Sequence, residues 1–248
     1  MEQAIPISGI SWLVTGLVAL TAGFKVRQSS RQHPEDGALR SFMWFFIFIG
    51  LFLLSLALPH IALLSSNSSS LFRFLMTWFS HDGPPHMFLY ISFAFIASTP
   101  FQLYYPKLRK PVFVFLILVG FSILVFTMIN VPYYPTKFDP VSGVTFPNHH
   151  PVQEKIIDPM YSRVSFLPAI LIFLFKGLPS PKRVVKIRSI LFVLGMVALA
   201  IAGPLNAAAD TSMEVIRANI FSLAGFLLLA TGVFYRVEEV KEEKEGKI

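Results

Sequence analysis

Long apolar stretches recur along this chain at a length that fits a lipid bilayer. A membrane-crossing helix needs about 20 mostly apolar residues, and seven stretches reach or approach that length. They are Ile7–Val26, Ser41–Leu64, Met87–Tyr105, Val112–Val131, Val164–Phe175, Val184–Leu205 and Val215–Tyr235. The fifth has the shortest apolar core, so we expect its helix to begin earlier, near Asp158 or Tyr161. The pattern predicts an all-α, polytopic membrane protein with a seven-helix transmembrane bundle over residues 1–236.

The composition supports a membrane protein over a soluble one. Hydrophobic residues make up 54% of the 248 residues and charged residues only 14%, whereas soluble proteins average about 25% charged residues. The sequence contains no Cys, which excludes disulfides, thiolate zinc sites and iron–sulfur clusters. We therefore expect the surface of the bundle to face lipid.

Lys and Arg are concentrated in every second connection between the stretches. One side of the predicted bundle carries Lys25, Arg27, Arg31, Arg40, Lys107, Arg109, Lys110, Lys176, Lys182, Arg183, Lys186, Arg188, Arg236, Lys241, Lys244 and Lys247. The other side carries Arg73, Lys137, Lys155, Arg163 and Arg217. Because cytoplasmic connections hold the excess of Lys and Arg, we expect the N-terminus outside and the C-terminus in the cytoplasm.

The same distribution accounts for the net charge of +7. Basic residues at the ends of membrane helices meet anionic lipid head groups. The charge therefore predicts membrane lipid as a partner, in the cell or cytoplasmic membrane, and no nucleic acid.

The longest expected outer connection runs from residue 132 to residue 162. Within it, apolar residues flank the turn sequence Asp139–Gly143, which predicts a small β-hairpin over Thr136–Phe146. Long loops of compact domains are often lids or binding loops. We expect the hairpin to be a small extracytoplasmic lid over the outer mouth of the bundle; the alternative is a solvated linker.

Two further segments fall outside the seven stretches. The segment Leu71–Phe79 is apolar but too short to span the bilayer. It predicts an interfacial helix on the outer surface or, alternatively, the start of a tilted third span. Residues 237–248 form a charged tail that continues the seventh helix into the cytoplasm, as a solvated helical end or as a signalling extension.

Several membrane functions lack their characteristic residues in this sequence. The seventh stretch has no mid-membrane Lys, which a retinal Schiff base needs. Only His60 lies within a stretch, near its outer end, which disfavours a haem held by two axial histidines. The metalloprotease pattern HExxH, the hydrolase pattern GxSxG and Gly-rich phosphate loops are absent from the sequence. No catalytic residue and no cofactor is predicted, and retinal and bis-His haem are disfavoured.

Histidines gather on the outer side of the predicted bundle. Imidazole and carboxylate groups together bind Zn, Cu or Fe, and imidazole also titrates near neutral pH. The candidate ligands for a transition metal are His81, His86, His149 and His150. The candidate ligand-binding set at the outer mouth is His60, Trp78, His81, Asp82, His86, Tyr133, Tyr134, His149 and His150. A metal site, a pH sensor and ordinary polar residues at a wet interface stay open as interpretations.

Small and hydroxyl-bearing residues are scattered through the apolar stretches. Small residues let membrane helices approach closely, which we expect at Gly16, Gly23, Gly195, Ala198, Ala202, Gly203, Gly225 and Gly232. A polar cavity at mid-membrane would be lined by Ser92, Ser98, Thr99, Ser122, Thr127 or Ser165. Isolated hydroxyls in such helices usually donate to a carbonyl of their own helix instead.

A family resemblance lies in the last two stretches and in the exit of the seventh helix, at Arg188–Gly195, Ser222–Leu229 and Tyr235–Glu239. With seven helices, an outer N-terminus and a charged helical continuation, the chain resembles the seven-helix sensor modules that precede bacterial histidine kinase domains. The resemblance implies sensing at the outer face and relay through the seventh helix. Since no kinase domain follows Ile248 in the sequence, it also implies signalling through a partner protein or, alternatively, a stand-alone relative of these modules.

Three classes of function stay open. The first is a receptor-like sensor, in which a bound ligand such as a small apolar molecule shifts the seventh helix. The second is a non-catalytic subunit or assembly factor of a larger membrane complex, with flat apolar lateral faces. The third is an enzyme or transporter acting on lipid or metal, with a polar cavity that reaches mid-membrane.

Overall fold

The computed structural model describes residues 7–65, 84–130, 135–139, 144–147, 158–207, 209 and 211–244. Its elements are α1 (Ile7–Gln32), α2 (Gly37–Ser65), α4 (His86–Tyr104), α5 (Pro106–Asn130), β1 (Pro135–Asp139), β2 (Val144–Pro147), α6 (Asp158–Ile172), the π-helical turn η2 (Phe173–Gly177), α7 (Arg183–Ala207) and α8 (Ser212–Lys244). Within these ranges, seven helices are long and apolar enough to cross a membrane. This confirms the seven predicted apolar spans, as expected of a multi-pass membrane protein.

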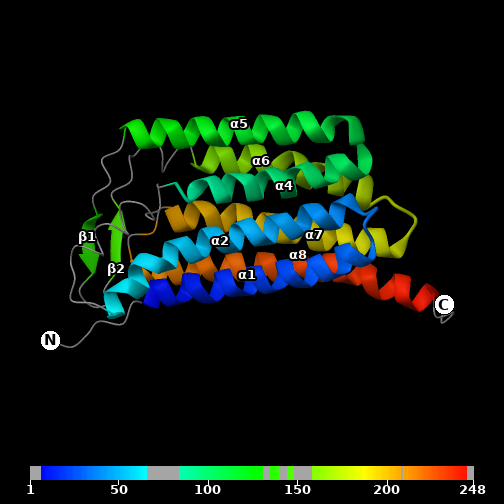
Figure 1. Cartoon of the computed structure of the whole chain (residues 1–248). Coiled ribbons are helices and arrows are strands. Elements are labelled where there is room, and N and C mark those ends of the chain that lie inside the picture. Colours follow the sequence, from blue (N-terminus) through cyan, green and yellow to red (C-terminus); the bar gives the residue numbers. More distant parts are fainter. Residues whose placement is uncertain are drawn as a thin grey trace.

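The helices form an elongated bundle in which neighbours along the chain run antiparallel (Figure 1). The most extensive helix pairs are α1 with α2 and α7 with α8. α4 packs on both α2 and α5, α6 packs on α4 and α7, and α1 also meets α8. α5, which packs mainly on α4, therefore lies at the edge of the bundle. α1 contributes Trp12, Ala19 and Val26 to the main hydrophobic core.

The helix of the fifth span begins early, as predicted from its short apolar core. α6 starts at Asp158, well before the first residue of the apolar stretch, Val164. Its helix passes into the π-helical turn η2, so that the apolar span runs to Gly177 instead of ending at Phe175. The polar first turn of α6 explains why hydropathy alone placed its start too late.

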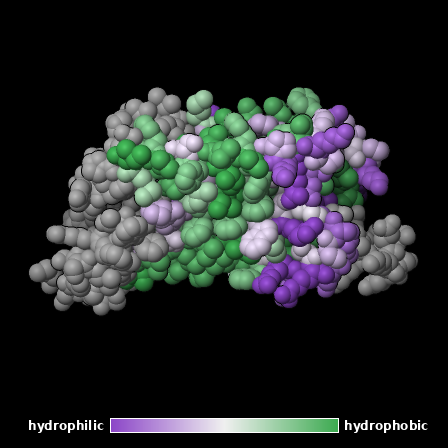
Figure 2. Space-filling view, turned by 45° about the horizontal axis from the view of Figure 1, so that its top comes forward, coloured by the Kyte–Doolittle hydropathy of each residue, from purple (hydrophilic) through white to green (hydrophobic). Residues whose placement is uncertain are grey.

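Charged side chains collect at one end of the bundle, which we call the basic end. α1, α4 and α8 end there, and α2, α5 and α7 begin there (Figure 1). Its basic residues are Lys25, Arg27, Arg31, Arg40, Lys107, Arg109, Lys110, Lys176, Lys182, Arg183, Lys186 and Arg188. Figure 2 shows hydrophilic side chains gathered at this end, beside a broad hydrophobic belt. α1 begins at the opposite end, which we call the hairpin end because β1 and β2 lie there (Figure 1).

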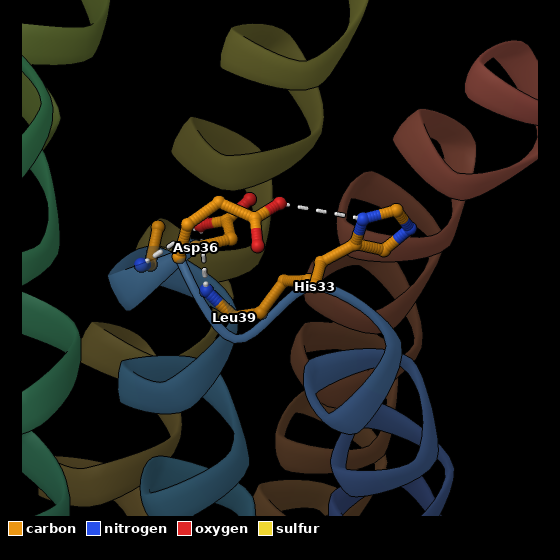
Figure 3. A network of polar contacts seen from close by, with 5 residues as sticks. His33, Asp36 and Leu39 are labelled. Atoms are coloured by element: carbon orange, nitrogen blue, oxygen red, sulfur yellow. Dashed lines mark hydrogen bonds and ion pairs between the residues drawn. The ribbon is translucent and has the colours of Figure 1, made fainter.

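A short turn at the basic end joins α1 to α2. Asp36 Oδ1 accepts hydrogen bonds from the main-chain nitrogens of Ala38 (3.0 Å) and Leu39 (3.2 Å), so it caps the first turn of α2. In the same turn, His33 Nδ1 lies 3.5 Å from Glu35 Oε1 (Figure 3). The cap fixes the start of α2 at Gly37, before the apolar stretch itself begins.

Glycines bring α7 and α8 into close contact. A Cβ added at Gly225 would lie 2.8 Å from Leu199 Cγ and 3.0 Å from the carbonyl oxygen of Gly195. A Cβ added at Gly195 would lie 2.8 Å from Leu229 Cγ and 3.1 Å from the carbonyl oxygen of Gly225. Each glycine is therefore covered by the leucine four residues after the other glycine.

The α1–α2 pair repeats this arrangement. A Cβ added at Gly50 would lie 2.7 Å from Leu20 Cγ, and one added at Gly16 would lie 3.2 Å from Leu54 Cδ2 and from the carbonyl oxygen of Gly50. Such contacts are the small-residue packing expected between helices in lipid. The predicted close approach is confirmed at Gly16, Gly23, Gly195, Gly225 and Gly232.

The two short strands pair as an antiparallel hairpin. Asp139 lies opposite Val144, and Phe138 lies opposite Thr145, within the predicted hairpin. β2 lies beside α1 at the hairpin end (Figure 1). The turn between the strands lies outside the described residues, as does the segment Leu71–Phe79.

Candidate functional site

A pocket lies between α2, α4, α6, α7 and α8, in the half of the bundle nearest the hairpin end. It encloses about 750 Å³ of space, counting the part that is open to the outside. Its walls are formed by Ile49, Phe52, Leu53, His86, Leu89, Tyr90, Phe93, Tyr161, Ser162, Leu199, Ala202, Gly203, Pro204, Asn206, Ser222 and Phe226. A largely apolar cavity with a few polar groups is the usual form of a small-molecule site.

Aromatic rings form the wall contributed by α2, α4 and α6. His86, the first residue of α4, meets the ring of Phe52 edge-on with ring centroids 5.0 Å apart. The rings of Phe93 and Tyr161 are nearly parallel, with centroids 6.1 Å apart. Tyr90 meets Tyr161 edge-on at 4.9 Å. Offset-parallel and edge-to-face pairs are the favourable arrangements for aromatic rings, so this wall is held in place by its own contacts.

Tyr161 also joins three helices through its hydroxyl group. The hydroxyl donates towards the main-chain oxygens of Tyr90 on α4 and Leu116 on α5, each 3.4 Å away. Only 4% of Tyr161 is exposed. Because the single proton of the hydroxyl is directed at these two carbonyls, the part of Tyr161 that a ligand would meet is its ring.

Two buried polar atoms in the pocket wall have no hydrogen-bond partner within the described part of the chain. They are Ser162 Oγ on α6 and Asn206 Oδ1 near the end of α7. Ser162 is 4% exposed. A buried polar atom without a partner costs about 1–3 kcal/mol, so a bound group that supplies the missing hydrogen bonds gains affinity. The Ser162 hydroxyl can donate or accept a hydrogen bond, whereas Asn206 Oδ1 accepts one.

Among the described residues that form the pocket wall there is no Asp, Glu, Lys or Arg. The described arginines of the hairpin end, Arg163 and Arg217, are exposed on the outside of the helices. An ion in the pocket would lose its hydration without meeting an opposite charge, which is costly. The pocket therefore suits neutral molecules.

Gly203 of α7 faces open space. No neighbouring heavy atom lies within 4 Å of a Cβ built at this position, and Gly203 is part of the pocket wall. The prediction that Gly203 supports a close helix contact is therefore wrong, because Gly203 is exposed and no other helix lies against it.

The structure places one residue of the predicted outer-mouth set in the pocket. His86 lies in its wall and is 3% exposed. His60 belongs to α2, but its side chain is not among those described. The remaining predicted residues lie outside the described ranges; they are Trp78, His81, Asp82, Tyr133, Tyr134, His149 and His150.

Most of the predicted metal ligands also lie outside the described residues. Of His81, His86, His149 and His150, only His86 is described. The described ranges contain no group of three or more His, Asp or Glu side chains arranged to hold a metal ion. The metal site consequently stays a prediction.

Four of the six hydroxyl groups named from the sequence donate within their own helices. Ser92, Ser98, Thr99 and Ser122 donate to the carbonyl oxygens of Leu89, Phe95, Phe95 and Leu118, at 2.7–3.1 Å. For these four residues, the prediction that such hydroxyls bond to their own helix is confirmed. Of the six hydroxyl residues proposed for a mid-membrane polar cavity, the five whose side chains are described do not line this pocket.

His86 was selected from the sequence, whereas the other two polar residues discussed above, Ser162 and Asn206, were not. Ser162 and Asn206 lie near helix ends, where a polar residue is unremarkable in a hydropathy profile. The available signal was that each is a polar residue next to a long apolar run.

Comparison of the chain with protein-family models, with curated proteins and with solved structures gave no match.

Proposed function

We propose that this chain is a receptor-like membrane sensor that binds a small apolar ligand in the pocket and relays the binding through α8. The proposal rests on one observation: α8 both lines the pocket and extends to the basic end of the bundle. Ser222 and Phe226 stand in the pocket wall, and the same helix continues without interruption to Lys244. At about 1.5 Å of rise per residue, the helix extends roughly 27 Å beyond Phe226.

Leu199 connects the pocket to the packing of α8. It lines the pocket, and its Cγ would lie only 2.8 Å from a Cβ at Gly225. Because helix interfaces are closely packed and deform little, a ligand that displaces Leu199 also shifts α8 against α7. Such a ligand changes the equilibrium only if it binds one helix arrangement more tightly than the other.

In this proposal the hairpin end faces the outside and the basic end faces the cytoplasm. The excess of Lys and Arg at the basic end supports this orientation. The hairpin of β1 and β2 is then a small lid on the ligand side, and residues 236–244 of α8 reach a protein partner in or at the cytoplasmic membrane.

The relay is tested by filling the pocket from its own wall. Since the chain has no Cys, Lys182→Cys before α7 and Lys241→Cys in α8 allow two spin labels to be placed cleanly. Gly203→Phe adds a ring at an exposed position of the pocket wall and is designed to occupy the pocket in place of a ligand. We expect the distance between the labels, measured by pulsed EPR in lipid nanodiscs, to change by about 1–2 Å.

Gly203→Ala is the matched control, because it leaves the pocket open and should reproduce the distances of the unmodified chain. Gly203→Leu provides a smaller filling side chain in case Gly203→Phe does not fold. A folded, pocket-filled variant with an unchanged distance distribution would show that α8 does not respond to the pocket, and the sensor proposal would be withdrawn.

A further inference from the structure

We infer that the ligand of this pocket is a neutral, ring-bearing molecule with one hydroxyl group, of the phenol or aromatic alcohol class. This inference rests on the proposed function, in which the pocket is the ligand site. It follows from three properties of the wall: its lack of charge, its aromatic faces and its two open polar atoms.

The lack of charge excludes ionic ligands. None of the described residues of the wall is Asp, Glu, Lys or Arg, and its one imidazole, that of His86, is 3% exposed and packs against the rings of Phe52 and Tyr90. A carboxylate or ammonium group buried there would have no counter-charge, and an unpaired buried charge is far more costly than a buried neutral group. Fatty acids and protonated amines are therefore poor ligands.

The aromatic faces favour a ring over a flexible chain. Phe52, Tyr90, Phe93, Tyr161 and Phe226 all contribute rings to the wall. A planar ligand can join them through offset-stacked or edge-to-face contacts, which add about 0.5–1.5 kcal/mol per pair beyond the burial of area. A rigid ring also loses less conformational entropy than an alkyl chain when it is bound.

The two open polar atoms select a hydroxyl group. Asn206 Oδ1 needs a donor, and Ser162 Oγ can give or receive a hydrogen bond. A hydroxyl both donates and accepts, so it can satisfy either atom. A carbonyl or ether oxygen only accepts, and would leave Asn206 Oδ1 buried without a partner.

The positions of these groups also orient the ligand. Ser162 and Asn206 lie near the ends of α6 and α7 at the hairpin end, whereas Phe93 and Phe226 lie further along α4 and α8 towards the middle of the bundle. The hydroxyl therefore points to the hairpin end, and the apolar rings point inward.

Four probes of one shape test this inference. They are 2-naphthol, 2-methoxynaphthalene, 2-methylnaphthalene and 2-naphthoate, measured by equilibrium dialysis against the full chain in nanodiscs, with empty nanodiscs subtracted. We expect saturable binding of 2-naphthol at least about tenfold tighter than that of the methoxy and methyl compounds, and no saturable binding of the naphthoate.

Variants assign the binding to the pocket. Asn206→Leu should weaken 2-naphthol by about tenfold or more without weakening 2-methoxynaphthalene, whose ether oxygen cannot donate to Asn206. Ser162→Ala should also weaken 2-naphthol, and Gly203→Phe should abolish the binding of both. Ser122→Ala is the matched control, because Ser122 bonds within α5 and does not line the pocket; it should change nothing.

The outcomes separate this inference from the sensor proposal. Equal binding of 2-naphthol and 2-methoxynaphthalene, or tight binding of 2-naphthoate, would overturn the ligand class and leave the relay untouched. Saturable 2-naphthol binding that survives Gly203→Phe would lie elsewhere and would overturn the inference. So would a lack of saturable binding of 2-naphthol. The spin-label distances in the pocket-filled variants need no ligand, so they judge the relay independently.

Discussion

Arg188 Nε of α7 donates a hydrogen bond to the carbonyl oxygen of Gly232 on α8, across 3.0 Å. The guanidinium carbon of Arg188 also lies 5.4 Å from the ring centroid of Phe192, one turn further along α7. A Cβ at Gly232 would lie 2.6 Å from Phe192 Cε1, so the two helices are in close contact here. Near the basic end, α7 and α8 are thus held together by a charged hydrogen bond and by ring packing.

Replacing Arg188 with Met should destabilise the pairing of α7 and α8. The substitution removes the charged hydrogen bond and the cation–π contact while keeping an apolar stem, and we expect a loss of about 1–3 kcal/mol in the free energy of unfolding. Unfolding in mixed detergent micelles measures it. Arg183→Met is the control, because Arg183 is exposed at the start of the same helix; equal losses in the two variants would contradict a specific role for Arg188.

Two glycines of the α7–α8 pair should respond in opposite ways to alanine. At Gly225 the added methyl group would meet Leu199 Cγ at 2.8 Å and the carbonyl oxygen of Gly195 at 3.0 Å, so we expect a loss of about 1–3 kcal/mol from overpacking. At Gly203 the methyl group enters open space, and Ala should stabilise the helix by about 0.5–1 kcal/mol. Thermal unfolding of both variants decides this, and a destabilised Gly203→Ala would mean that the pocket is filled.

The hydroxyl of Tyr161 should contribute to stability without shaping the pocket. Tyr161→Phe removes the hydrogen bonds to the carbonyls of Tyr90 and Leu116 and keeps the ring against Phe93. We expect a loss of about 0.5–1.5 kcal/mol in unfolding free energy, with the binding of 2-naphthol unchanged. Tyr105→Phe, at a 39% exposed position, should cost less; a changed naphthol affinity in Tyr161→Phe would show that the hydroxyl reaches the ligand.

The number and length of the spans could be predicted because the bilayer imposes one strong constraint on apolar length. Helix starts were less accurate, since they depend on single residues. Asp36 caps α2 before the apolar run, and Asp158 opens α6 several residues before Val164. A hydropathy profile averages over such residues and places the start where the apolar side chains begin.

The pocket could not be predicted, because it depends on which way each side chain faces. Gly195 and Gly203 are both small residues of α7, eight positions apart, so at 3.6 residues per turn they point about 80° away from each other. One meets α8 and the other meets the pocket. Ser162 and Asn206 likewise face the pocket because of their angular positions on α6 and α7. The sequence shows which way a side chain points only when the neighbours of each helix are known.

The orientation of the bundle in the membrane is open to a direct test. Lys182 at the basic end is exposed, and Met213 at the hairpin end is 57% exposed. A chain without Cys gives no background in thiol labelling, so Lys182→Cys and Met213→Cys report their own side. We expect a membrane-impermeant maleimide to label Met213→Cys in intact cells, and to label Lys182→Cys only after permeabilisation, because the excess of Lys and Arg stays in the cytoplasm.

The unmodified chain is the blank for this experiment, and a second outer position, Met160→Cys at 60% exposure, guards against a poorly reactive site. The reverse labelling pattern would turn the bundle over, placing the pocket and the hairpin on the cytoplasmic side and the end of α8 outside. In that case a ligand would have to arrive from within the cell. Labelling of Lys182→Cys and Met213→Cys from one side would instead contradict the crossing of the membrane by α7, which lies between the two positions.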